Sequence, residues 1–104
     1  MNWGTTPEAD NDLIRGREWI ESDNAAAAQA FLKTARECFD RLGQFPEMGA
    51  LARLKGREFE GVRFFVLSPP FNSWVVFYRV GRMVEVVRVL YGSQNWRSEP
   101  DRFF

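Results

Sequence analysis

Residues 74–95, WVVFYRVGRMVEVVRVLYGSQN, contain the least ambiguous element of this sequence. Two runs of β-branched and aromatic residues, 74–80 and 83–90, flank a short turn at Gly81-Arg82. This pattern predicts a β-hairpin. Both runs carry apolar side chains on both faces, so we expect each face of the hairpin to be covered at least in part.

The second run of the hairpin mixes arginine with apolar residues. Strict alternation predicts one face made of Val84, Val86, Arg88 and Leu90, opposed by Met83, Glu85, Val87, Val89 and Tyr91. Arg79 and Arg88 both lie inside the strands. An arginine in such a position usually packs its aliphatic stem at the rim of a sheet while its head reaches water.

Two amphipathic segments precede the hairpin. Thr6-Pro7-Glu8 predicts a helix start, with Thr as N-cap and Pro at the first helical position. Ser22-Asp23-Asn24 separates this helix from a second one over residues 25–42, which Gly43 is expected to end. The apolar stripes recur at +4, +3 and +4: Ala9, Leu13, Gly16 and Ile20 in the first helix, Phe31, Ala35, Cys38 and Leu42 in the second.

Shorter strands are expected at the edges of the fold, over residues 1–5, 51–54 and 62–67. The order of elements then predicts an α+β fold, in which an N-terminal helical hairpin packs on a mostly antiparallel sheet of three to four strands. A chain of 104 residues is expected to form a single domain over residues 1–104.

The composition excludes several kinds of chemistry. The sequence has no histidine, which removes histidine metal sites and the Ser-His and Cys-His nucleophilic pairs. Its single cysteine, Cys38, lies in the apolar stripe of the second helix and is expected to be a core residue. We therefore expect neither a metal nor a cofactor. No apolar run spans a bilayer and no secretory signal is visible, which favours a cytoplasmic protein without a membrane partner.

Charge is distributed unevenly along a chain whose net charge is zero. Residues 1–48 contain five Lys/Arg and nine Asp/Glu, whereas residues 49–104 contain nine and five, together with eleven of the sixteen aromatic residues. A basic, aromatic half fits an acidic partner, either nucleic acid or an acidic protein segment. The alternative is that the two halves complement each other.

Six fragments in order resemble one known family. They are TPEAxxDL, WIxxDNxxAA, RLxxFPEMG, GVRFF, VVFYRV and VEVVRVLYGSQN, which span Thr6 to Asn95. Together they are similar to the ParE-like branch of the RelE/ParE superfamily of bacterial toxins. The resemblance implies the toxin of a type II toxin–antitoxin system, bound in a hetero-oligomer by an antitoxin that is encoded beside it. The family usually has a histidine where this chain has Tyr91, which leaves the role of this position open.

The resemblance implies two alternative targets. ParE-like toxins are associated with inhibition of DNA gyrase, and zero net charge, a pI near 6.3 and the absence of histidine favour a protein target over RNA. RelE-like toxins instead cut mRNA on the ribosome without a metal. Such an endoribonuclease site would need basic side chains and a tyrosine, for which the candidates are Arg63, Arg79, Arg88, Tyr91 and Lys55. A third possibility is an inactive relative that only binds its antitoxin.

The sheet face away from the helices needs a cover. Phe65 and Phe77, or their neighbours of opposite parity, are expected there. The cover is either an antitoxin segment, which could also extend an edge strand, or the C-terminal tail with Trp96, Phe103 and Phe104. In the loop FPEMG (45–49), Phe45 and Met48 are expected to close the end of the helical hairpin. The candidate residues for binding a target or antitoxin are Arg63, Phe65, Phe77, Arg79, Arg88, Tyr91 and Trp96.

Overall fold

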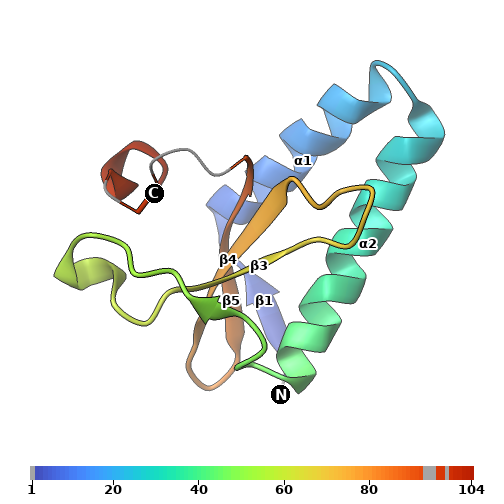
Figure 1. Ribbon diagram of the computed structural model, residues 1–104. Helices are drawn as coiled ribbons and strands as arrows, with labels where there is room; N and C mark the ends of the chain where they lie inside the picture. The colour runs from blue at the N-terminus through green and yellow to red at the C-terminus, as the bar shows by residue number, and fades with distance from the viewer. Residues whose placement is uncertain (1, 93–95, 98) are drawn as a thin grey trace.

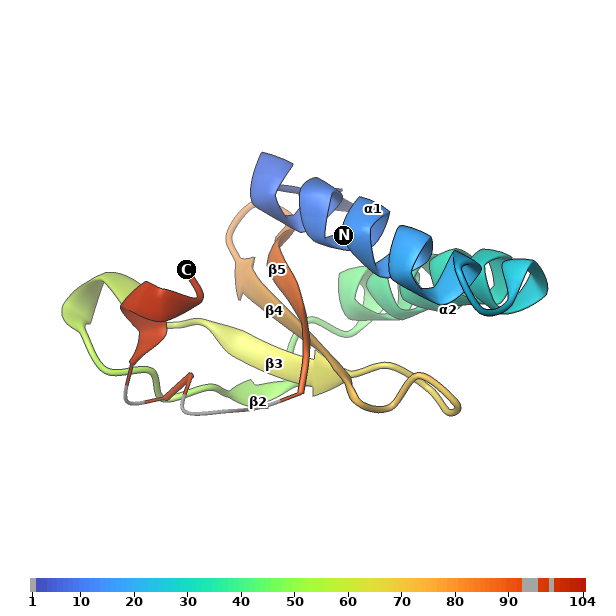
Figure 2. The same cartoon turned by 90° about the horizontal axis from the view of Figure 1, so that it is seen from above.

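A five-stranded mixed sheet carries two helices on one face (Figures 1 and 2). The computed structural model describes residues 2–92, 96–97 and 99–104. The sheet order is β1-β5-β4-β3-β2, with β1 parallel to β5 and all other pairs antiparallel. The predicted α+β class and helical hairpin are confirmed. The elements are β1 (Trp3–Thr5), α1 (Pro7–Glu21), α2 (Ala25–Gln44), β2 (Ala50–Leu51), η1 (Arg57–Phe59), β3 (Arg63–Val66), β4 (Trp74–Val80), β5 (Val84–Tyr91) and η2 (Pro100–Arg102).

Both helices begin where their capping residues predict. The Thr6 side chain accepts a hydrogen bond from the Ala9 N–H at 3.1 Å, and Asn24 accepts one from the Ala27 N–H at 3.0 Å. Helix α2 continues through Gly43 to Gln44, so the prediction that Gly43 ends the helix is wrong. Gly43 is buried in the last turn, where packing rather than glycine propensity decides the backbone.

The helix-facing core contains the two predicted stripes. Gly16 is buried because α1 lies close to Trp74 of β4 and Phe31 of α2, and a Cβ added there would be 2.9 Å and 3.0 Å from their rings. Partly buried Leu13 and Ile20 pack against the same core. Its fully buried members include Ala9, Phe31, Ala35, Cys38, Phe39, Leu42, Val76, Tyr78, Val84, Val86 and Val89.

A β-bulge interrupts β5. Phe77 pairs with Arg88 whereas its neighbour Tyr78 pairs with Val86, so Val87 is an extra residue in the ladder. Strict alternation is therefore wrong beyond Val86: Val89 instead of Arg88 joins the helix-facing core. The bulge re-aims Arg88, which shares the other face with Phe77.

Strand β2 is shorter than predicted. The expected strand over residues 51–54 is only Ala50–Leu51, because Arg53 has a φ of 56°, in the left-handed region that interrupts a strand. Ala52 and Leu54 nevertheless turn inward and are buried. They belong to a second core on the sheet face opposite the helices.

The chain's own C-terminal tail contributes to this second core. The Phe77 ring lies 5.0 Å from the ring of Trp96 and 5.0 Å from that of Phe104. Figure 2 shows η1 and η2 on the side of the sheet away from the helices. Of the two covers considered from the sequence, the tail occupies this face within the described residues. The other members are Ala52, Leu54, Val62 and Val75, with partly buried Phe59, Phe64, Val87, Leu90 and Phe103.

The loop after α2 does not close the end of the helical hairpin. Phe45 is 62% exposed and Met48 is 36% exposed, so that prediction is wrong. The hydroxyl of Tyr78 occupies the inner side of this loop, where it forms hydrogen bonds with the Pro46 carbonyl and the Gly49 N–H.

Within the described residues, neither helix is long and apolar enough to cross a bilayer.

Candidate partner-binding site

A buried ion pair joins α1 to β5. Arg88 Nε lies 2.7 Å from Asp12 Oδ2, and Arg88 Nη2 lies 2.9 Å from Asp12 Oδ1. The backbone N–H of Val89 also donates to Asp12 Oδ2, at 2.9 Å. Asp12 is 6% exposed, so three hydrogen bonds compensate the burial of its charge.

The position of Asp12 follows from the helix period. It lies three residues after Ala9 and four before Gly16, so it belongs to the buried stripe of α1. Strand β1 pairs only with residues 84–86 of β5 and leaves the edge beyond them to α1. Thr6 accordingly donates to the Val87 carbonyl at 2.9 Å, and Asp12 accepts from Val89. Sequence reasoning missed Asp12, although an acidic residue at a stripe position was a usable signal.

Arg88 also binds the C-terminal tail. Its Nη1 donates to the carbonyl of Phe103, so one guanidinium connects α1, β5 and the residue that follows η2. The hydrogen bonding of Arg88 to the Asp12 carboxylate raises the pKa of Arg88 above its ordinary value, against the opposing effect of burial. Its charge is thus neutralised by a carboxylate, which makes Arg88 a poor candidate for gripping a free phosphate.

Beside this pair, three aromatic rings surround a hollow of about 260 Å³, called here the aromatic hollow. The Tyr91 ring lies 5.1 Å from Trp19 and 5.2 Å from Trp74, both edge to face. Trp19 is 57% exposed and Tyr91 is 59% exposed, whereas Trp74 is buried. The hollow is lined by Asp12, Arg15, Gly16, Trp19, Trp74, Arg88, Val89, Leu90 and Tyr91.

Arg15 supplies an accessible positive charge at this hollow. Its side chain is 72% exposed, and its Nη2 lies 3.6 Å from Asp12 Oδ1, which Arg88 already occupies. Exposed Trp, Tyr and Arg side chains around a hollow are typical of residues that dominate protein–protein binding. The arrangement therefore suits a protein partner.

The basic residues proposed from the sequence do not form one cluster. Arg63 donates to the Gly49 carbonyl at 2.7 Å, and Arg79 donates to the Glu58 carbonyl at 2.5 Å. Arg79 and Arg88 line a further hollow of about 280 Å³, and Tyr91 lines the aromatic hollow with Arg88. Neither hollow is lined by Arg63 or Lys55. The structure thus brings together Arg88 with Tyr91 and Arg88 with Arg79, but not all five residues.

Two of the three apolar candidates, Phe77 and Trp96, are buried inside the fold, and the third, Phe65, is partly buried. Phe77 is 0% exposed and Trp96 is 5% exposed in the second core, while Phe65 packs against the helix-facing core. Phe65 and Phe77 consequently lie on opposite faces, since Phe65 pairs with Val76 and Phe64 pairs with Phe77. The rings of Phe77 and Trp96 are therefore not accessible to a partner in this structure, whereas part of Phe65 is.

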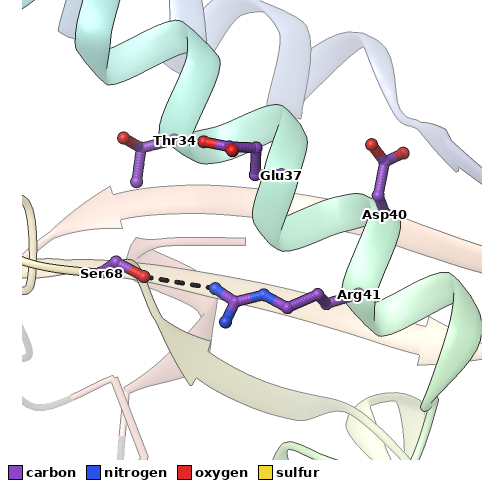
Figure 3. Close-up of a pocket in the computed structure, with 5 residues that line it drawn as sticks. All are labelled: Thr34, Glu37, Asp40, Arg41 and Ser68. Atoms are coloured by element: carbon purple, nitrogen blue, oxygen red, sulfur yellow. Dashed lines mark hydrogen bonds between the residues drawn. The ribbon is translucent and has the colours of Figure 1, made fainter.

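A polar hollow of about 420 Å³ lies where α2 meets the chain after β3 (Figure 3). Arg41 Nη2 donates to Ser68 Oγ at 3.2 Å, whereas the Asp40 carboxylate points away from Arg41. Thr34 and Glu37 complete its lining. In the part of the chain that the structure describes, no three His, Cys, Asp or Glu residues gather as metal ligands.

Comparison with known proteins identifies the fold and the family. The family model described as "ParE toxin of type II toxin-antitoxin system, parDE" matches residues 5–96. A solved structure described as "Chromosomal ParDE TA system from P. aeruginosa" superimposes with a TM-score of 0.71 at 20% sequence identity, covering 89% of this chain and 97% of that chain. A comparison with curated proteins finds no match.

Proposed function

This chain belongs to the ParE toxin family of type II toxin–antitoxin systems, and we propose that it inhibits bacterial growth by binding DNA gyrase at the aromatic hollow. A cognate antitoxin binds the toxin in a hetero-oligomer and neutralises it. The toxin acts in the cytoplasm, where both partners are found.

Arg88 and the aromatic rings beside it differ in accessibility, and this contrast supports a protein target. Arg88 donates two hydrogen bonds to Asp12 and one to the Phe103 carbonyl, so its guanidinium is engaged within the fold. Trp19 and Tyr91, in contrast, expose more than half of their surface. Exposed rings of this kind suit a toxin that binds a protein, whereas a ribonuclease needs several free cations to hold phosphate. Of the two arginines that line this hollow, Arg15 is accessible and Arg88 is engaged.

The proposal is tested by pulse labelling of new DNA and new protein during the first minutes after induction in a bacterial host. We expect DNA synthesis to fall while translation continues, and the purified chain to inhibit supercoiling by gyrase. An early fall in translation together with cleaved mRNA would contradict the proposal and favour an endoribonuclease. Continued growth would leave only the antitoxin-binding function.

A matched pair of variants tests the location of the site. The double substitution Trp19→Ala/Tyr91→Ala removes both exposed rings, and we expect gyrase inhibition to weaken at least about tenfold. Ile14→Ala serves as the control because Ile14 is 47% exposed on the same helix but does not line the hollow. Thermal unfolding of both variants checks that the fold is retained. Equal inhibition by the two variants would place the target site elsewhere.

A further inference from the structure

An exposed apolar band crosses the end of α2 and the β4–β5 turn. Two shallow hollows of about 480 and 420 Å³ meet at Gln44, which lines both. The exposed fractions are 62% for Phe45, 42% for Val80 and 41% for Met83. We call this surface the apolar band; its apolar members are Trp3, Phe45, Pro46, Met48, Val80 and Met83.

Side chains on the inner side of the loop that contains Phe45 and Met48 hold it by hydrogen bonds. The buried hydroxyl of Tyr78 donates to the Pro46 carbonyl at 2.7 Å and accepts from the Gly49 N–H at 2.9 Å. Arg63 donates to the Gly49 carbonyl at 2.7 Å. These bonds hold both ends of the four-residue segment 46–49, which contains Met48. A surface that is ordered before binding loses less conformational entropy when a partner docks.

Two acidic residues and no basic residue line the two hollows of the band. Asp40 and Glu47 line its two hollows, and neither forms an ion pair with the described residues. Asp40 accepts a hydrogen bond from Trp3 Nε1 at 2.7 Å and points away from Arg41 (Figure 3). The C-terminal end of α2 adds the partial negative charge of its carbonyl groups. Three arginines lie beside the band: Arg82 in the turn between Val80 and Met83, Arg41 in the last turn of α2, and Arg63, which donates to the Gly49 carbonyl.

We propose that the apolar band anchors the cognate antitoxin through an apolar segment that carries basic side chains. Apolar anchors would fill the hollow lined by Phe45, Pro46, Met48 and Val80, and the basic groups would lie near Asp40, Glu47 and the end of α2. A second copy of this chain fits less well, because an isologous contact would bring the same negative charges together. The inference rests on the antitoxin half of the proposed function and adds its location and chemistry.

This location separates anchoring from toxicity. The aromatic hollow contains Trp19 near the C-terminal end of α1, whereas the band lies at the C-terminal end of the antiparallel α2. The two sites have no lining residue in common. Variants of the band should therefore remain toxic and escape neutralisation.

The test uses the purified full chain and, as the probe, the protein encoded by the reading frame adjacent to the toxin gene. For Phe45→Ser/Met48→Ser we expect the Kd from calorimetry to rise about thirtyfold. Leu32→Ser is the control, because Leu32 is 37% exposed on α2 but lies outside the band; its Kd should stay within about threefold of the parent. In cells the double variant should still inhibit growth, and co-expression of the probe should no longer restore it.

A charge reversal tests whether the antitoxin contributes basic side chains to the contact. Glu47→Lys should raise the Kd about fivefold, and more at low salt than at high salt, whereas Glu37→Lys outside the band should leave it unchanged. If the parent and the band variants bind the probe equally well, this inference is overturned and the proposed function remains intact. A parent that does not bind would overturn the antitoxin half of the proposed function as well. Light scattering that shows a parent dimer, dissociated by Phe45→Ser/Met48→Ser, would assign the band to self-association instead.

Discussion

Asp12 in α1 and Arg88 in β5 form a two-point ion pair across 76 residues of sequence, with N to O distances of 2.7 Å and 2.9 Å. The pair closes the part of the β5 edge that β1 does not reach, because Asp12 also accepts the Val89 N–H. It joins the helical layer to the sheet and, through the Phe103 carbonyl, to the C-terminal tail.

Removing the charge of Asp12 should destabilise the fold. In Asp12→Asn, Arg88 loses its counter-charge while its side chain stays only 19% exposed, so we expect about 3 kcal/mol less free energy of unfolding. Urea denaturation followed by circular dichroism measures this difference. Glu18→Gln, which changes an exposed acid on the same helix, should shift stability by less than about 0.5 kcal/mol. Equal effects of both substitutions would show that the ion pair does not hold the layers together.

Gly49 should not tolerate a side chain. A Cβ at this position would lie 2.5 Å from the Tyr78 hydroxyl and 2.6 Å from the Phe64 carbonyl oxygen, and the second contact is with backbone. Gly49→Ala must therefore displace β3 or the loop, and we expect about 2–4 kcal/mol of destabilisation in thermal or urea unfolding. Gly81→Ala is the matched control, since nothing lies within 4 Å of the added Cβ. A stable Gly49→Ala protein would contradict the packing described here.

Cys38 should make the protein less stable in alkali. Burial raises the pKa of its thiol from 9.0 to about 11, while Arg41 opposes the shift. Between these two pH values the unfolded chain loses a proton that the folded chain keeps, so stability falls as pH rises from about 9 to about 11, by at most about 2–3 kcal/mol. Below pH 9 this effect is absent.

The comparison with Cys38→Ala isolates the effect, because alanine removes the thiol without adding a titratable group. Urea unfolding at pH 8, 9, 10 and 11 should show a smaller alkaline loss for the variant than for the parent. Burial also raises the pKa of Tyr78, which therefore contributes to the alkaline loss in both proteins; its contribution is slightly smaller in the variant, because the charge of Cys38 is a minor further cause of that rise. In the parent, a thiol reagent at pH 8 should label Cys38 only after denaturation, since the side chain is fully buried. Parallel pH profiles, or rapid labelling of the native protein, would refute the assignment.

The C-terminal tail should behave as part of the core. Phe104 packs on Phe77 at 5.0 Å and on Phe59 at 5.8 Å, so Phe104→Ala should lower the free energy of unfolding by about 1–3 kcal/mol. The control is Arg102→Ala, which removes an exposed ion pair with Glu99 and a distant contact, 6.0 Å, with the Phe103 ring; it should change stability by less than about 0.5 kcal/mol. Increased binding of a hydrophobic dye by Phe104→Ala would report the uncovered sheet face. If stability and dye binding both stay unchanged, the tail does not cover this face in solution.

The sequence determined the elements whose causes are local. Thr6 and Asn24 cap the two helices, the stripes through Ala9 and Phe31 define their buried faces, and the apolar runs around Gly81 form the central hairpin. These features depend on residues within one or two helical turns or on strand alternation, so a single chain reveals them. The family model matches residues 5–96, a range that contains all of these elements.

Only the tertiary structure decided the site, because contacts distant in sequence create it. The bulge at Val87 turns Arg88 onto the sheet face opposite the helices, because Arg88 pairs with Phe77. Strict alternation along β5 predicts the other face. Asp12 becomes the partner of Arg88 because β1 is too short to cover the β5 edge. Phe45 stays exposed because the hydroxyl of Tyr78, more than thirty residues away, holds the inside of the loop. Composition and spacing specify which side chains are apolar or charged, whereas the free energy of packing the whole chain decides which of them meet.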